Sequence, residues 1–232
     1  MIEVLSSLDD VGASVTACRA CPRLVEHREL IAQIKKREFR DWSYWGKPVA
    51  GFGDPSARLL IVGLAPAAHV ANRTGRMFTG DSSGDWLYEA LFRYGFASQP
   101  ESVSREDGLT LQDCFITASG RCSPPDNKPT QEELDSCQPF LEAELRLLTS
   151  VTVTLVLGHV AHRQWLRATG LWDRLAPAER PAFNHGALHE VGNDAVLITS
   201  YHPSRQNTNT GRLTRNMWHR VFETARDILD AT

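Results

Sequence analysis

The stretch Arg58–Gly63 reads RLLIVG and is apolar almost without interruption. Three further runs have the same character: CFITAS at 114–119, VTVTLVLG at 151–158 and AVLITS at 195–200. Continuous rather than alternating apolar runs are typical of strands that are buried on both faces of a parallel sheet. The four runs therefore predict a central, mainly parallel sheet of four strands.

Helical patterns follow each of these runs. They cover residues 85–94, 130–148, 160–169 and 214–231. Thr130 precedes Glu133 by three residues, the spacing of a capping box, so a helix is expected to start there. Strands that alternate with helices indicate βαβ crossovers. We therefore predict an α/β fold, a three-layer sandwich whose central four-stranded sheet is flanked by helices, in a single domain over residues 1–232. The aromatic, glycine-rich segment 35–53 fits neither pattern.

The composition narrows the class of protein. The chain has 232 residues, of which 42% are hydrophobic and 23% charged, as in globular proteins with one large core. Its formal net charge of −3 provides no global basic field, so a nucleic acid would need a local basic groove. No apolar run is long enough to span a bilayer, and Met1–Leu5 lacks the basic start of a signal peptide. We expect a cytoplasmic monomer.

Four of the five cysteines form two spaced pairs. Cys18 and Cys21 lie close together near the N-terminus, and Cys122 and Cys137 form a wider pair. Because cytosolic thiols are kept reduced, four thiols in this arrangement suggest a metal or iron–sulfur centre rather than disulfides. Tetrathiolate zinc and an iron–sulfur cluster both remain open on spacing alone. Either centre would tie the N-terminal arm to the middle of the chain.

Polar residues and turn formers follow all four predicted strands. In an open parallel sheet, ligands bind beyond the carboxyl ends of the strands. The segments in question are GLAP at 63–66, RCSPPDNKP at 121–129, Gly158-His159, and YHPS at 201–204. The sequence therefore predicts a functional site at this edge of the sheet.

The loop after the first strand is long and punctuated by glycine. Small residues in such a loop let a ligand approach the backbone closely. Phe78 is a candidate stacking platform, and Asp81 is a candidate polar group in the site. The structural alternative is that Phe78 belongs to the core and that Asp81 caps the helix that follows.

The loop after the last strand combines a rigid turn with polar side chains. His202 precedes Pro203, and proline restricts the backbone on both sides of the bond. A neutral imidazole held there can donate a hydrogen bond to a developing anion. Asn127, in the second loop, is either an amide that reads a base or a turn residue after two prolines. The polar residues with the right composition to follow phosphates include Ser204, Arg205, Asn207 and Arg212.

Together these motifs resemble the uracil-DNA glycosylase superfamily, in particular its family 5. The resemblance runs from Cys18 to the C-terminal helix. It is carried by GLAPAAH at 63–69 with NRTGR at 72–76, FTGD at 78–81, Arg121-Cys122 with PPDNKPT at 124–130, and HPS at 202–204 with Asn207 and TGRLT at 210–214. The four paired cysteines match the family's [4Fe-4S] ligands, which leaves Cys114 as a small hydrophobe on a core strand.

The resemblance implies a monofunctional DNA glycosylase that acts in base excision repair, associated with the nucleoid while it does so. Its partner would be double-stranded DNA with a deaminated base, which must be flipped out of the stack to be reached. The implied catalytic residues are Asp81, His202 and Asn127. The implied base pocket is Gly63, Leu64, Ala65, Pro66, Ala68 and Phe78. The implied DNA-binding residues are Arg73, Arg76, Ser204, Arg205, Asn207 and Arg212.

The first motif departs from other branches of the superfamily. They carry an acidic or amide side chain there, whereas residues 64–68 read LAPAA, as is typical of family 5. Ala118 likewise stands where some relatives have an asparagine that reads the base, and Asn127 is a candidate substitute. The mechanism would then depend on leaving-group stabilisation, with Asp81 as the remaining polar group. Fewer specific hydrogen bonds should also broaden the range of bases, to include hypoxanthine and xanthine.

Two other functions compete with this interpretation. The apolar first motif is compatible with a catalytically weak or inactive DNA-binding relative of the same fold. A small-molecule α/β hydrolase with a structural zinc is the third hypothesis, but the chain has no P-loop.

Overall fold

The central sheet has six strands in the order β1-β3-β2-β4-β6-β5. The computed structural model describes residues 5–192 and 194–231. Strands β2, β3, β4 and β6 form a parallel block, and β1 and β5 pair antiparallel with its two edges. The strands are β1 Phe52–Gly53, β2 Leu59–Gly63, β3 Cys114–Ala118, β4 Val153–Leu157, β5 Ala187–Glu190 and β6 Val196–Ser200. The predicted α/β class and the four predicted strands are confirmed.

The prediction of four strands missed the two edge strands, β1 and β5. Strand β1 is two residues long, and every second residue of β5 is exposed, so neither produces an apolar run. A strand at the edge of a sheet is solvated on one side and does not need such a run. Periodicity therefore detects only the buried strands.

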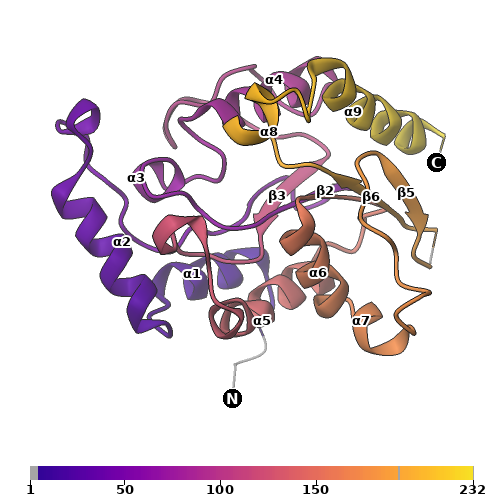
Figure 1. Cartoon of the computed structure of the whole chain (residues 1–232), viewed down its shortest axis with the longest axis horizontal. Helices are drawn as coiled ribbons and strands as arrows, with labels where there is room; N and C mark the ends of the chain where they lie inside the picture. The colour runs from indigo at the N-terminus through magenta and orange to yellow at the C-terminus, as the bar shows by residue number, and fades with distance from the viewer. Residues whose placement is uncertain (1–4, 193, 232) are drawn as a thin grey trace.

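Helices cover both faces of the sheet (Figure 1). Helices α4 and α9 pack on one face, and α5, α6 and α7 pack on the other. The helices are α1 Leu8–Ala17, α2 Pro22–Ile34, α3 Ala71–Thr74, α4 Ser82–Arg93, α5 Gln131–Leu147, α6 His159–Ala168, α7 Leu171–Arg174, α8 Arg205–Asn209 and α9 Arg215–Asp230, with short 3-10 turns η1 Arg37–Phe39 and η2 Pro125–Asn127. The predicted three-layer sandwich is confirmed.

Strand β2 shows why the central runs are apolar throughout. Leu59 and Ile61 point into the core formed with α4 and α9, whereas Leu60 and Val62 point into the core formed with α5 and α6. Successive side chains of a strand alternate between faces, so a strand covered on both faces needs an apolar residue at every position.

Two helices, α1 and α2, come before the first predicted strand in the chain. Val11 and Val15 of α1 pack against Ala143 of α5. Cys18 is the C-cap of α1 and Cys21 is the N-cap of α2. The close cysteine pair therefore lies in the turn between two helices that pack on the body of the protein.

The predicted capping box at the start of α5 is confirmed. The Glu133 amide donates to Thr130 Oγ1 at 3.3 Å, and the Thr130 amide donates to Glu133 Oε2 at 2.8 Å. Arg23 of α2 donates to the same carboxylate, with 2.7 Å between Nη2 and Oε2. The cap therefore also joins the N-terminal arm to α5.

A buried ion pair connects the loop after β3 to α5. Arg121 donates to Glu144 through Nη1, 2.9 Å from Oε1, and through Nη2, 2.5 Å from Oε2. Thr117 Oγ1 donates to the same Oε2 at 2.6 Å. Only 1% of the Arg121 side chain and 2% of the Glu144 side chain are exposed. Removing one partner of a buried pair leaves an uncompensated charge and costs about 3–5 kcal/mol, so this pair holds the second loop firmly against α5.

No helix within residues 5–192 and 194–231 is long and apolar enough to cross a membrane. Most of the segment on which the expected absence of a signal peptide was judged, residues 1–4, lies outside the described residues.

Candidate functional site

The loops after β2 and β3 are bonded to each other at the carboxyl edge of the sheet. The Ser119 amide donates to the Gly63 carbonyl at 3.0 Å, and the Gly120 amide donates to the Leu64 carbonyl at 2.7 Å. A Cβ atom on Gly120 would lie 3.3 Å from Ala65 Cβ. The small residues of the first motif therefore fit closely against the second loop and form one wall of the predicted site.

Phe78 lies over the end of β2. Its φ of 55° is in the left-handed region, which costs a bulky residue conformational energy. A Cβ on Gly63 would come within 2.9 Å of the Phe78 ring, and a Cβ on Gly84 would overlap the Phe78 carbonyl oxygen at 1.8 Å. Two glycines therefore make room for this ring and its backbone. The ring is half-buried and packs against the main core, as the structural alternative expected, and its role as a stacking platform stays a prediction.

His202 faces Phe78 across the same edge. The two ring centroids are 5.8 Å apart and the ring planes are inclined by 27°. Asn207 Nδ2 donates to the His202 carbonyl at 2.8 Å and braces the turn. Burial lowers the pKa of His202 below its ordinary value, although the nearby Asp81 carboxylate acts in the opposite direction. The imidazole is therefore neutral at pH 7, in the state that the sequence interpretation requires.

Asp81 is the N-cap of α4. Its Oδ1 accepts a hydrogen bond from the Gly84 amide at 3.0 Å. This is the capping role that the sequence offered as the alternative to a catalytic one. The carboxylate also acts electrostatically on His202 and opposes the lowering of its pKa by burial. The structure thus brings Gly63, Phe78, Asp81 and His202 into one group.

Asn127 is carried by the second loop, after β3. It is exposed in the η2 turn, where both Asp126 and Asn127 have positive φ values, 54° and 56°. The backbone N–H of Asn127 donates to the Pro124 carbonyl at 3.2 Å. In the part of the chain that the structure describes, its side chain makes no hydrogen bond to His202 or Asp81. The turn interpretation therefore accounts for its backbone, and its catalytic role stays a prediction.

Arg73 and Arg76 are not placed as DNA-binding side chains, and that expectation is corrected. Arg73 is 3% exposed and Arg76 is 5% exposed. Arg73 Nε donates to the His69 carbonyl at 2.9 Å. Arg76 binds Asp107 through both Nη atoms, at 2.9 and 2.6 Å. The sequence shows two arginines in a polar loop but not that folding turns their guanidinium groups inward, onto partners within the protein.

The side chains of the loop after β6 are of two kinds: some bond within the loop itself, and others are exposed. Ser204 caps α8 by accepting from the Asn207 amide, and Asn207 braces the His202 turn, so these two side chains have structural partners. Arg205 is exposed, and its Nε donates to Ser82 Oγ at 3.2 Å, which connects this loop to the start of α4. Arg212 is exposed and lies 4.5 Å over the Tyr201 ring.

All four paired cysteines line one cavity. It lies between the α1–α2 turn, the loop after β3 and α5, and Leu24, Pro48 and Phe140 form part of its apolar wall. Within the described residues, no three His, Cys, Asp or Glu side chains form a group suited to a single metal ion. The donor set and the enclosed apolar wall fit a group that four thiolates share. Cys114 is buried in β3 and does not line this cavity.

Arg28 contacts one of these cysteines and was missed by the sequence interpretation. It is 2% exposed, and its Nη1 donates to Cys122 Sγ at 3.2 Å. Its Nε has no hydrogen-bond partner within the described residues. Its Nη2 lies 3.7 Å from Glu29 Oε1, and thiolates at the cysteines would place further negative charge beside this buried guanidinium. The spacing of seven residues from Cys21, two turns of one helix face, is the signal that could have identified it.

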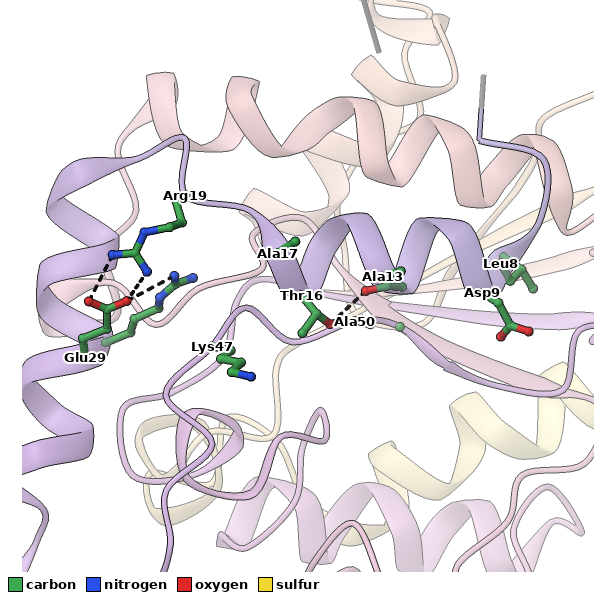
Figure 2. A pocket seen from close by; sticks show the side chains of 12 residues that line it. Leu8, Asp9, Ala13, Thr16, Ala17, Arg19, Glu29, Lys47 and Ala50 are labelled. Atoms are coloured by element: carbon green, nitrogen blue, oxygen red, sulfur yellow. Dashed lines mark hydrogen bonds and ion pairs between the residues drawn. The ribbon is translucent and has the colours of Figure 1, made fainter. Parts of the chain in front are cut away.

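An open groove of about 800 Å³ lies between α1, the middle of α2 and residues 47–51 (Figure 2). Arg19 and Glu29 point toward each other at one end of it and form an ion pair. None of its lining residues belongs to the loops that follow β2, β3, β4 or β6. The groove is therefore separate from the group around His202.

Comparison with known proteins assigns the family. Residues 50–226 match the uracil DNA glycosylase superfamily. A type-5 uracil-DNA glycosylase of Mycobacterium leprae is 48% identical over 223 residues, which cover 96% of each chain. The type-5 enzyme of Thermus thermophilus is 49% identical over 92% of this chain and 94% of its own, and that of Pyrobaculum aerophilum is 44% identical over 89% and 86%. The chain belongs to the uracil-DNA glycosylase superfamily, on its type-5 branch.

Proposed function

We propose that this protein excises uracil from DNA, as a repair enzyme that hydrolyses the N-glycosidic bond. One observation carries the proposal: a neutral His202 faces Phe78 at the carboxyl edge of the sheet, within electrostatic range of the Asp81 carboxylate. This edge is where ligands bind in open parallel sheets. Membership of the superfamily favours this function over a small-molecule hydrolase.

The proposed reaction starts from a uracil flipped out of the duplex, because a stacked base is beyond the reach of the protein. Phe78 supplies an aromatic face for the base. The bond between the base nitrogen and the sugar breaks, and its electron pair stays on the base. His202 donates a hydrogen bond to the base carbonyl that gains negative charge, and water then adds its hydroxyl to the sugar carbon and its proton to the base. A fixed neutral donor stabilises such an anion without first having to reorganise.

Asp81 acts on the other half of the separating charge in this proposal. The sugar becomes positively charged as the base leaves, and a carboxylate fixed at the start of α4 stabilises that charge. Its Oδ1 is held by the Gly84 amide, which sets the direction of the group toward the sugar and the attacking water. Asn127, from the exposed second loop, remains the proposed amide partner of the base.

Exposed cations of the last loop are proposed to hold the duplex. Arg205, the first residue of α8, and Arg212, which follows that helix, are exposed and can contact phosphates, whereas Ser204 and Asn207 shape the turn that carries them. The protein is proposed to act on double-stranded DNA as a monomer.

Single-turnover base release tests the proposed function. A duplex with one uracil opposite guanine is mixed with excess protein, and free uracil is measured over time. Release supports the glycosylase, whereas tight binding without release would favour the inactive DNA-binding relative. Because Leu64–Ala68 offers no polar side chain to the base, we expect the same assay to detect release of hypoxanthine and xanthine too; strict uracil specificity would contradict this breadth.

The cysteine cavity is proposed to hold a [4Fe-4S] cluster on Cys18, Cys21, Cys122 and Cys137. When bound, the cluster would supply a covalent brace between the N-terminal arm and the segment that carries Asn127. Four thiols around one apolar cavity and the buried Arg28 donor support this assignment. Tetrathiolate zinc is the alternative and would give no absorption near ~400 nm.

Replacing Cys122 by alanine should remove the cluster and lower the melting temperature, because the arm loses its brace. The measurements are iron content, absorption near ~400 nm and thermal unfolding. Cys114→Ala is the matched control, since this cysteine is buried outside the cavity and its loss should leave iron and absorption unchanged. Full stability of a folded, iron-free Cys122→Ala protein would contradict the bracing role.

A further inference from the structure

The segment between α2 and β1 stands out in charge. Residues 35–47, which we call the hook, contain five basic and two acidic side chains, a net charge of +3 in a chain of net charge −3. The hook holds three of the four lysines of the whole chain. A local concentration of positive charge on a negative protein marks a surface for an anionic partner.

Aromatic side chains fix the hook to the loop that follows β2. The Arg73 guanidinium lies 3.8 Å from the Phe39 ring centroid and 4.2 Å from that of Trp42. Tyr44 Oη and His69 Nδ1 are hydrogen-bonded at 3.0 Å. Arg73 was expected to bind DNA, but its guanidinium instead holds the hook against this loop.

Backbone hydrogen bonds also attach the hook to the loop that follows β2. The Trp45 amide donates to the Arg73 carbonyl at 2.9 Å, and the Gly46 amide donates to the Asn72 carbonyl at 3.0 Å. Lys35 Nζ donates to the Trp42 carbonyl at 2.7 Å and closes the turn on itself. The hook is therefore a shaped element, and a ligand that binds it does not have to order it first.

The hook lies on the same side of the molecule as the loops of the candidate site. It stands next to α3, the short helix within the loop after β2 (Figure 1). The Lys36 ammonium, followed by smaller contributions from Arg73 and Arg205, lowers the pKa of Glu38. Arg205 Nε donates to Ser82 Oγ at 3.2 Å, and Arg73, which holds the hook, donates from Nη2 to the Gly80 carbonyl at 3.1 Å, so the hook and the last loop both border residues 80–82.

Two arginines of the hook are available to a partner. Arg37 and Arg40 are exposed, and neither guanidinium has a hydrogen-bond or ion-pair partner within the described ranges 5–192 and 194–231. Lys36, in contrast, is paired with Glu38 at 2.6 Å. A guanidinium presents a planar set of donors that matches the oxygens of a phosphate.

We propose that the hook binds backbone phosphates of the duplex beside the flipped nucleotide, with Arg37 and Arg40 as the contacts. This inference rests on the proposed function, because it takes DNA as the partner. The hook would form one side of the DNA-binding surface and Arg205 with Arg212 the other, so that the duplex is held across the mouth of the site. Contacts of this kind position the DNA and carry no base specificity.

The double variant Arg37→Gln/Arg40→Gln tests the proposal. We expect its Kd for an undamaged duplex to rise about tenfold near 0.1 M salt, and the slope of log Kd against log salt to fall by about 1 to 2, since each phosphate contact contributes about 0.9. The rate constant of uracil release at saturating protein should not change. Fluorescence anisotropy measures the first two quantities and single-turnover kinetics the third.

Arg93→Gln/Arg220→Gln is the matched control, because it removes two exposed arginines from α4 and α9 and leaves the hook intact. It should bind like the wild type, with the same salt slope. An unchanged Kd and slope in the hook variant would overturn the proposal, as would a wild-type protein that does not bind duplex. Binding to undamaged DNA does not require catalysis, so the two proposals can fail separately. If the wild type bound DNA but released no uracil, the proposed activity would be refuted. A weaker binding of the hook variant would still support the role of the hook.

Discussion

Replacing His202 by alanine is expected to slow single-turnover release of uracil by about 100- to 1,000-fold, the usual cost of removing one preorganised donor from a developing anion. His202 is the imidazole that faces Phe78, and its turn is braced by Asn207. Alanine removes the donor and leaves the backbone turn in place. The loss should appear in the rate constant at saturating protein and not in the Kd for DNA.

The pH profile separates a neutral donor from a cationic one. Burial lowers the pKa of His202, so the imidazole remains neutral through the neutral range and gains a proton only at a pH below its ordinary pKa of about 6.5. A neutral donor predicts a release rate that stays flat between about pH 6.5 and 8. A rate that rose in proportion as the pH fell through this range would show that the protonated imidazole is the active form.

Two further variants sharpen the test of His202. His202→Gln keeps a neutral N–H donor and should recover part of the lost rate. His27→Ala removes a histidine from α2, outside the strand-end loops, and should react like the wild type. If His202→Ala kept the wild-type rate constant, the imidazole would have no catalytic role and the proposed mechanism would be wrong.

Replacing Asp81 by asparagine is expected to lower the rate of release by about 100-fold or more while leaving the melting temperature unchanged, in line with the usual contribution of a positioned catalytic group. Asparagine caps helices as well as aspartate does, so the hydrogen bond from the Gly84 amide can persist. Only the negative charge is lost. The variant therefore isolates the charge beside the sugar from the capping role.

Comparison with Asp81→Ala completes this test. Alanine loses the cap as well as the charge, so it should match Asp81→Asn in rate and be less stable by about 1 kcal/mol. Ser7→Ala removes the N-cap of α1, far along the chain from the site, and should lose stability without losing activity. A wild-type rate in Asp81→Asn would reduce Asp81 to a helix cap.

The fold was predictable where burial leaves a periodic record. The runs that became β2, β3, β4 and β6 are covered by helices on both faces, so all their residues are apolar and the pattern is unambiguous. The two edge strands and the hook leave no such record, since they are short or half-exposed. The turn residues before α5 were equally clear, because a capping box depends only on local spacing.

The candidate site was predictable as a set of loops and less so as a set of side chains. Phe78, Asp81 and His202 meet at the carboxyl edge of the sheet because parallel strands end there together. The prediction that Arg73 and Arg76 bind DNA was wrong. The sequence does not show that Phe39 and Trp42 enclose the Arg73 guanidinium, or that Asp107 binds that of Arg76.

Residue types at short, regular spacings are enough to predict the α/β class, the four inner strands, the loops at the carboxyl edge and the two cysteine pairs. Which polar groups face solvent and which bind partners inside the protein is visible only in the folded chain. That choice depends on contacts between residues far apart in the chain, such as Arg28 with Cys122 and Arg121 with Glu144. A buried guanidinium must find a partner wherever the fold provides one, and no local pattern records where that will be.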